Sequence, residues 1–164
     1  NLIIFGNLPY NISSQILVKF IKINNWPPNY KDIIFMFQKE LSDKIVASYP
    51  SKNYGRLSIL TNYRLNPVNK FNISSNCFFP KPKVVSSIIH FKPKINFRIK
   101  IKNIDRLEKI TNLFFSKKRK MIKKSLLKLL DNKKINLIGD INLNLRPENL
   151  SPEIYYKITN LYES

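Results

Sequence analysis

The feature that most constrains the fold is an alternation of strand-like and helix-like patterns over the first 50 residues. Leu2–Phe5 and Asp32–Gln38 are mainly apolar runs of strand length, which predicts two strands buried on both faces. Ile12–Ile23 has apolar residues at helical spacing, and Lys39–Tyr49 follows the second strand with the same pattern. Strand, helix, strand, helix is the order of a parallel sheet connected by helical crossovers. We therefore predict an α/β fold.

The pattern changes after this unit. Leu57–Tyr63 and Val84–Phe91 predict two further strands, and residues 66–82 between them, which contain three prolines, predict a loop. Because no helix-length pattern separates these strands, we expect them to pair antiparallel at one end of the sheet. Apolar residues then follow helical spacing from Leu107 to Leu130, and Pro152–Tyr162 predicts a last amphipathic helix.

These patterns divide the chain into three expected parts. Residues 1–94 carry the sheet, residues 95–102 form a linker, and residues 103–164 form a small all-α domain. The chain opens in what the pattern predicts to be a buried strand and has no initiator Met, so we expect it to be the middle of a longer protein.

The charge of the chain is large and clustered. The formal net charge is +19, no Asp or Glu occurs from residue 44 to residue 104, and 12 Lys and Arg fall in that interval. A second block follows within the predicted helical stretch, at Lys117, Lys118, Arg119 and Lys120. Basic tracts of this kind favour a nucleic-acid partner. An anionic membrane surface is the weaker alternative, and the second block is also typical of a solvated helix face.

The sequence also excludes several classes of site. One cysteine, Cys77, rules out an intramolecular disulfide framework and indicates a reducing compartment, so we expect a cytoplasmic protein. One His and one Cys are too few for an ordinary zinc site, and we expect no metal. No apolar run reaches the length of a membrane span, so we expect no membrane partner.

The first candidate site is Asn7-Leu8-Pro9-Tyr10, directly after the first predicted strand. Open α/β sheets bind ligands at the carboxyl ends of their strands. The Asn7 amide oxygen accepts from an amino group, Pro9 fixes a turn that aims its backbone carbonyl, and Tyr10 can stack on a flat base. The set suits an exocyclic amine on an unstacked nucleobase, although Asn-x-Pro is also an ordinary turn signal.

Six runs, all in the same order, resemble the ribosomal RNA adenine N6-dimethyltransferases, a branch of the class I S-adenosylmethionine-dependent methyltransferases. The resemblance spans essentially the whole chain, and its runs are Gly6–Ser13, Gln38–Glu40, Tyr54–Ser58, Phe78–Ser86, Arg119–Leu126 and Arg146–Ser151. It implies a partial class I (Rossmann-like) methyltransferase sheet followed by a small helical domain that contacts rRNA.

The resemblance also implies a reaction. The family transfers two methyl groups from S-adenosylmethionine to the N6 amine of adenine. It implies that Asn7 and Pro9 accept the N–H bonds of that amine, that Tyr10 stacks on the flipped base, and that Asn7 and Leu8 lie beside the cofactor. Phe78 is implied on the other face of the adenine. Alternatively, Phe79 supplies the ring on that face of the adenine, and Phe78 is then a core residue.

The expected RNA contacts come from the basic residues. Arg56 either contacts phosphate or braces its loop, and Lys81, Lys83 and Lys117–Lys120 are expected along the RNA backbone. His90 and Cys77 receive no role.

The chain departs from the family in its cofactor site. Its only glycines are Gly6, Gly55 and Gly139, so it contains no glycine-rich phosphate or cofactor loop. We therefore expect the C-terminal portion of a dimethyltransferase, which alone is inactive because most of the cofactor site lies in an N-terminal half.

The expected substrate is small-subunit rRNA, with two adjacent adenines near its 3′ end dimethylated during ribosome assembly by a monomeric enzyme. Leu8 and the Arg146–Ser151 run favour this branch. One alternative is the antibiotic-resistance branch, which methylates large-subunit rRNA. Another is a non-catalytic rRNA-binding assembly factor on the same scaffold.

Overall fold

The first half of the chain folds into the predicted alternation of strands and helices. The computed structural model describes residues 2–164, beginning with β1 (Leu2–Asn7), α1 (Ser13–Ile21), β2 (Tyr30–Gln38) and α2 (Lys39–Ile45). Three further elements complete this part: α3 (Arg56–Arg64), β3 (Leu65–Ile73) and β4 (Ser86–Pro93). A short 3-10 helix, η1 (Ser75–Cys77), lies in the connection between β3 and β4.

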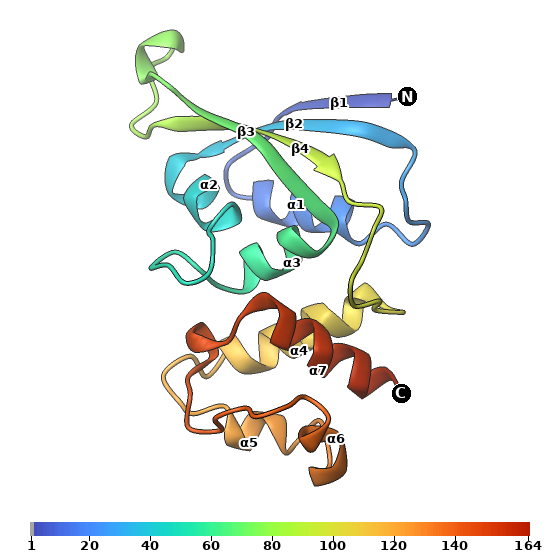
Figure 1. Ribbon diagram of the computed structural model, residues 1–164. Coiled ribbons are helices and arrows are strands. Elements are labelled where there is room, and N and C mark those ends of the chain that lie inside the picture. Colours follow the sequence, from blue (N-terminus) through green and yellow to red (C-terminus); the bar gives the residue numbers. More distant parts are fainter. Residues whose placement is uncertain (1) are drawn as a thin grey trace. The chain divides into compact units, whose positions relative to one another are not determined.

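The four strands form one mixed sheet in the order β1-β2-β4-β3 (Figure 1). β1 pairs parallel with β2, which confirms the predicted α/β crossover. β4 runs antiparallel to both of its neighbours, β2 and β3. The expected antiparallel pair at the sheet end therefore exists and is formed by β3 and β4. The residues of β3 are not those that were predicted for the third strand.

Helices α1, α2 and the C-terminal part of α3 cover one face of the sheet (Figure 1). On this face the side chains of Phe35 and Phe37 from β2 and of Ile89 and Phe91 from β4 are at most 1% exposed. Leu17 of α1 is fully buried with them. This face holds the core of the sheet.

The opposite face is apolar but more exposed. Phe5 of β1 is 71% exposed and Ile3 is 48% exposed, and both share this face with Ile34 of β2 according to the strand register. The prediction that the first strand is buried on both faces is therefore wrong for the described residues. Its continuous apolar run indicated burial, yet β1 is an edge strand whose outer side pairs with no described strand.

The segment 57–63, predicted as a strand, is helix α3. Ser58, Ile59, Leu60 and Tyr63 are all buried, so the helix shows no polar face. A short segment that is buried all round cannot be assigned to helix or strand by periodicity. The helix begins where the Ser58 Oγ accepts the Gly55 N–H at 3.1 Å, a local bond that satisfies a helix N-terminus.

The third strand instead lies in the region predicted as a loop. β3 occupies Leu65–Ile73 at the sheet edge, although it contains Pro67. Proline cannot donate to a strand ladder, but it is tolerated on an edge strand and at an irregularity. The register shifts between Pro67 and Asn69, which accommodates the ring.

The second half of the chain is helical. It comprises α4 (Ile104–Phe115), α5 (Lys123–Leu126), α6 (Asn132–Asn136), the 3-10 helix η2 (Pro147–Asn149) and α7 (Pro152–Glu163). α4 packs on α7, where the Phe114 and Tyr155 rings meet edge to face at 5.6 Å. The Tyr155 hydroxyl donates to the Pro147 carbonyl at 2.7 Å, and burial raises the pKa of this hydroxyl.

The prediction that the basic block lies in a helical stretch is wrong, because the helical backbone breaks between α4 and α5. Lys117, Lys118, Arg119 and Lys120 lie in this break, and like charges three and four positions apart destabilise a helix. Backbone groups here bond elsewhere: the N–H of Ile122 donates to the carbonyl of Leu145 at 2.9 Å. The basic block therefore forms a loop.

The chain divides into two compact units, which we call the sheet unit and the helical unit. The sheet unit comprises residues 1–47 and 60–96, and the helical unit comprises residues 48–59 and 97–164. Residues 48–59 join the helical unit through bonds such as that of the Tyr54 hydroxyl to the Leu150 carbonyl, 2.8 Å. The domain boundaries expected from the sequence stay a prediction.

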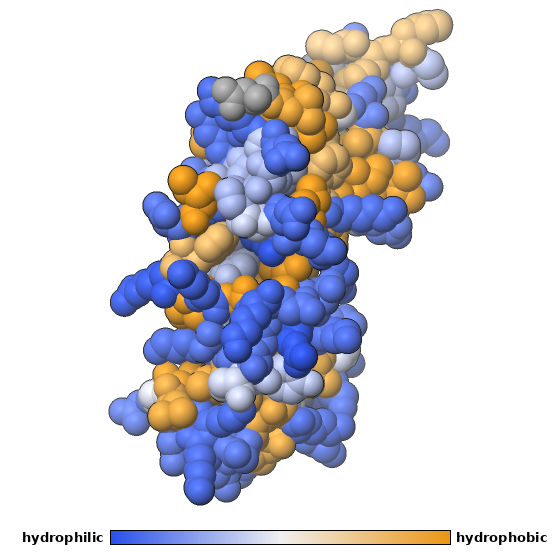
Figure 2. All heavy atoms as spheres, turned by 90° about the vertical axis from the view of Figure 1, so that its right-hand side faces the viewer, coloured by the Kyte–Doolittle hydropathy of each residue, from blue (hydrophilic) through white to orange (hydrophobic). Residues whose placement is uncertain are grey.

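Figure 2 shows the surface chemistry of one side of the molecule. Hydrophilic side chains cover much of this side, and apolar side chains reach the surface between them. No helix among residues 2–164 is both long and apolar enough to cross a membrane.

Candidate functional site

Asn7 is the last residue of β1, and it borders a shallow pocket of about 400 Å³. The pocket opens on the sheet face that carries Phe5 and Ile34. Its lining comes entirely from the sheet unit and consists of Phe5, Gly6, Asn7, Ile34, Met36, Ile73, Cys77, Phe78 and Ile88. The Asn7 side chain is therefore an amide at the edge of a mainly apolar hollow.

The turn after Asn7 is held by three hydrogen bonds. The Ile12 N–H donates to the Pro9 carbonyl at 3.2 Å, and the Ser13 hydroxyl donates to the Tyr10 carbonyl at 3.1 Å. A carbonyl oxygen has two lone pairs, so the Pro9 carbonyl keeps one for a ligand. The Tyr10 hydroxyl lies 2.6 Å from the Ser86 Oγ, which fixes the direction of the ring. Tyr10 does not line the pocket itself.

Gly6 sets the position of Asn7 relative to the second strand. A methyl group at Gly6 would lie 2.8 Å from Cδ1 of Phe35 and 2.9 Å from a terminal carbon of Leu8. The Phe35 ring is fully packed and cannot give way cheaply. Glycine is thus required by this close approach.

Phe78 and Phe79 have different surroundings. Phe78 is half-buried and lines the pocket together with Asn7, whereas Phe79 is 102% exposed. Of the two rings that the sequence left open, Phe78 is the one that shares a pocket with Asn7. The role of that ring in stacking stays a prediction.

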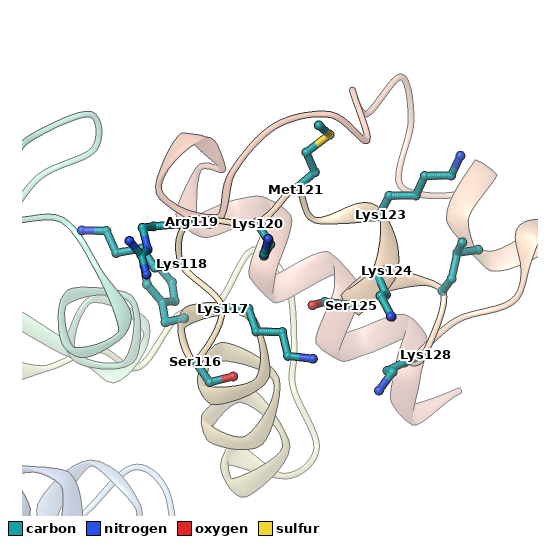
Figure 3. Close-up of a pocket in the computed structure, with 12 residues that line it drawn as sticks. Ser116, Lys117, Lys118, Arg119, Lys120, Met121, Lys123, Lys124, Ser125 and Lys128 are labelled. Atoms are coloured by element: carbon teal, nitrogen blue, oxygen red, sulfur yellow. The ribbon is translucent and has the colours of Figure 1, made fainter.

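A second hollow lies in the helical unit, and we call it the basic hollow (Figure 3). Its volume is about 1040 Å³, and seven cationic side chains line it: Lys117, Lys118, Arg119, Lys120, Lys123, Lys124 and Lys128. In Figure 3 the ammonium groups of Lys117, Lys124 and Lys128 lie on one side of the loop, while Lys118 and Lys123 extend in other directions. Repulsion between these cations favours the approach of an anion.

Two of the predicted RNA contacts already hold protein partners. Arg56 donates to Glu108 at 2.9 Å, as the bracing alternative expects, and a contact of Arg56 with phosphate stays a prediction. Lys118 pairs with Glu148 at 3.1 Å, and both side chains remain largely exposed. Lys81 and Lys83 are exposed on the connection that leads into β4.

Each carboxylate of the sheet unit has a Lys or His side chain as a partner. Asp32 lies 2.6 Å from His90, Glu40 accepts from Lys44 at 2.6 Å, and Asp43 binds Lys39 and Lys70. The hydrogen bond from His90 lowers the pKa of Asp32, and hydrogen bonds from Lys70 and Lys39 lower that of Asp43. None of the three lines the Asn7 pocket. Residues 2–164 contain no cluster of three or more His, Cys, Asp or Glu able to hold a metal ion.

Several residues in the pocket or bonded to its neighbours were not identified from the sequence. Ser86, the partner of Tyr10, lies in the Phe78–Ser86 run, but nothing in that run assigned it a contact. Met36, Ile73 and Ile88 enter the pocket because β2, β3 and β4 are neighbours, which the sequence showed only in part.

Comparisons with known proteins agree with this arrangement. The family described as "Ribosomal RNA adenine dimethylase" matches residues 1–164. The chain is 46% identical over 164 residues to the ribosomal RNA small subunit methyltransferase A of Pelagibacter ubique (strain HTCC1062), covering 98% of this chain and 61% of the relative. It is 39% identical to the protein of the same name from Buchnera aphidicola subsp. Baizongia pistaciae, covering 96% and 59%. The chain thus spans about three fifths of these relatives' length.

Two solved structures resemble the chain. One is a dimethyladenosine transferase from Plasmodium falciparum, with a TM-score of 0.76 and 25% identity over 95% of this chain and 64% of that one. The other is the 23S rRNA methyltransferase ErmE, with a TM-score of 0.68 and 20% identity over 99% and 66%, which shows the fold alone. These likenesses confirm the predicted methyltransferase fold class. Since the family description matches the whole chain, the protein belongs to the ribosomal RNA adenine dimethylase family.

Proposed function

We propose that the protein, as encoded, transfers methyl groups from S-adenosylmethionine to the N6 amines of two adjacent adenines near the 3′ end of small-subunit rRNA. The curated relatives described above carry a small-subunit name, which favours this branch over the large-subunit alternative. The observation that carries the proposal is the pocket shared by Asn7 and Phe78 at the carboxyl end of β1. We place the enzyme in the cytoplasm as a monomer that binds immature small subunits.

The acceptor chemistry follows from the groups around the pocket. The lone pair of the adenine N6 is delocalised into the ring, so this nitrogen is a poor nucleophile. Hydrogen bonds from the amine to Asn7 Oδ1 and to the remaining lone pair of the Pro9 carbonyl would favour a pyramidal nitrogen whose lone pair is available. This is catalysis by positioning and electrostatics, and it requires no strong general base.

The base itself would be held by aromatic rings. Tyr10, whose hydroxyl is anchored on Ser86, would stack on one face of the adenine, and Phe78 would close the other. Stacking on an aromatic side chain contributes about 1–3 kcal/mol per base. That energy would offset part of the cost of unstacking the adenine from its neighbours.

The methyl donor fits this chain only in part. S-adenosylmethionine is the donor of the family, and Asn7 and Leu8 are the residues here that we place beside it. Its ribose hydroxyls need a carboxylate or similar acceptor, yet every carboxylate of the sheet unit is already bonded to a Lys or His side chain and lies outside the pocket. The residues described here therefore do not complete a cofactor site, and we derive no step through the cofactor.

The basic hollow supplies the second part of the proposal. RNA affinity depends largely on contacts between cations and phosphates. Lys117, Arg119 and Lys120 line the hollow together with the three lysines of the following turn, which suits an RNA backbone. Lys81 and Lys83 add positive charge to the sheet unit.

The test removes the amide at the pocket. Asn7→Ala should lower the rate of methyl transfer to small-subunit rRNA by about 100-fold or more, because an acceptor of the reacting amine is lost, while RNA affinity stays nearly intact. Asn25→Ala, which removes an exposed amide in the loop after α1, is the matched control. Unchanged turnover in Asn7→Ala would contradict the proposed role.

A further inference from the structure

Phe79 is more exposed than any other large apolar residue in the described part of the chain. Its exposure is 102%, compared with 71% for Phe5 and 56% for Phe71. It lies in the connection between β3 and β4, after the 3-10 helix η1. An aromatic ring of this size in water carries an unfavourable hydration free energy that a partner can remove.

The backbone turns Phe79 away from the Asn7 pocket. Phe78 has φ −122° and ψ 146°, which is extended backbone. Side chains of consecutive residues in extended backbone point to opposite sides. Because Phe78 lines the pocket, Phe79 faces outward, away from the pocket. The two rings are neighbours in the sequence but are available to different ligand groups.

The charge near Phe79 indicates what kind of partner fits. Lys81 and Lys83 follow within four residues and are exposed. No Asp or Glu occurs between residues 44 and 104, so no acidic side chain of this tract competes for a ligand near the ring. An exposed aromatic ring flanked by cations is the combination that binds unpaired nucleic acid, where bases stack and phosphates pair with lysine.

We propose that Phe79 is a stacking platform for an unpaired nucleobase that flanks the adenine held at the Asn7 pocket. Lys81 and Lys83 neutralise phosphates of the same strand. The inference rests on the proposed function for the identity of the RNA, and it assigns a further positioning residue that selects unpaired sequence around the target. Phe79 contacts a base that is not methylated in that encounter.

The experiment measures the affinity of the encoded protein for a short unpaired RNA that contains the target adenines. Phe79→Ala should weaken binding by about 5- to 150-fold, which corresponds to the loss of one base–aromatic stack. Phe79→Trp should restore affinity, and its added fluorescence over the background of Trp26 should be quenched when RNA binds.

A second RNA separates stacking from charge. In an oligonucleotide with the same phosphates but an abasic site at each position that flanks the target, Phe79→Ala and the wild type should bind equally. Lys81→Gln with Lys83→Gln should instead reduce the salt dependence of binding on both RNAs, by about 1.4 in log–log slope for two contacts. Phe79→Ala should leave that slope unchanged.

Equal affinity of Phe79→Ala and wild type for the intact RNA would overturn the platform. So would an equal loss on intact and abasic RNA, which would indicate a protein contact or a folding defect instead. Methyl transfer is measured in parallel on Asn7→Ala: full activity there contradicts the proposed function, whereas the affinity ratio for Phe79→Ala decides the platform by itself.

Discussion

The Tyr10 hydroxyl and the Ser86 hydroxyl are 2.6 Å apart, and this contact allows the ring and its anchor to be tested separately. Tyr10→Phe keeps the stacking ring and removes the anchor, so we expect the affinity for adenine-containing RNA to fall only a few-fold. Tyr10→Ala removes the stack, so we expect a loss of about 5- to 150-fold.

Fluorescence titration of an RNA with 2-aminopurine at the target position would measure both variants. Ser86→Ala is the matched control, because it removes the same hydrogen bond from the other side and should behave like Tyr10→Phe. Equal affinities for Tyr10→Ala and wild type would mean that the Tyr10 ring does not stack on the base and has only a structural role in the turn.

Gly6 supports a second prediction at the residue scale. Gly6→Ala places a methyl group 2.8 Å from the Phe35 ring, so we expect the free energy of unfolding to fall by about 1–3 kcal/mol through overpacking. Urea unfolding of single and double variants would measure it. Phe35→Leu should relieve the contact, so the double variant should lose less than the sum of the single losses. If the losses of unfolding free energy in the two single variants add up to the loss in the double variant, the methyl group at position 6 does not press against the Phe35 ring.

At this scale the sequence located the amide and the ring but not their surroundings. Asn7 and Phe78 line one pocket and Tyr10 lies in the turn after Asn7, while the roles that the resemblance implies for them stay predictions. Arg56 is different: its partner Glu108 is 52 residues away in the chain, so only the fold shows the ion pair. A pairing that depends on packing between distant segments leaves no local pattern.

Among the elements, α2 and β3 are tied together by Asp43. Its carboxylate binds Lys70 of β3 and also Lys39, 2.9 Å away at the start of its own helix. Hydrogen bonds from these lysines lower the pKa of Asp43. A depressed folded pKa adds stability above the unfolded value, about 3.9, and this stability is lost as the pH falls through the lower folded pKa.

We therefore predict that Asp43→Asn destabilises the protein at pH 7 and makes its stability less dependent on pH below about 4. Urea midpoints at a series of pH values from 7 to 2.5 would show the difference between variant and wild type. Asp140→Asn, which removes an exposed carboxylate elsewhere, should leave the acid slope close to that of the wild type. A parallel pH profile for Asp43→Asn would rule out the ion pair as a source of stability.

Element types were predictable for the helices with one apolar face and for the strands with a continuous apolar run. α1, β2, α2, β4 and α7 appear where apolar spacing indicated them. The pattern misled where burial is complete or nearly absent: α3 is buried almost all round, and β3 is largely exposed and contains a proline. The spacing of apolar residues identifies an element by its one buried face. Neither α3 nor β3 has one buried face and one exposed face.

For the molecule as a whole, the distribution of charge is the property that the fold changes most. Lysines spread over residues 117–128 of the sequence converge on the basic hollow, because the chain breaks between α4 and α5. A continuous helix would have distributed the same residues around its axis. The sequence predicted a basic tract and left its form open between a solvated face and an RNA contact.

We predict that Lys117→Gln, Lys124→Gln and Lys128→Gln together reduce the salt dependence of RNA binding by about 2 in log–log slope, since each lost contact with single-stranded RNA removes about 0.7. Affinity measured between 50 and 200 mM salt would show it. The matched control carries the same change in charge at Lys52, Lys109 and Lys133, which are exposed and lie outside the hollow. Equal salt-dependence slopes for the two triple variants would show that the lysines of the basic hollow do not contact RNA phosphates and are only a solvated surface.

Gly6 has one more consequence, which concerns how loss-of-function variants of this protein are interpreted. A side chain at Gly6, the neighbour of Asn7, would collide with the buried ring of Phe35, and Phe35 does not line the Asn7 pocket. Changes at Gly6 or Phe35 should therefore appear in a genetic screen beside true active-site variants. The two kinds of variant differ in their second-site suppressors. For a change at Gly6, suppressors should lie in the core, where a smaller side chain makes room and returns Asn7 to its place without any change in the pocket.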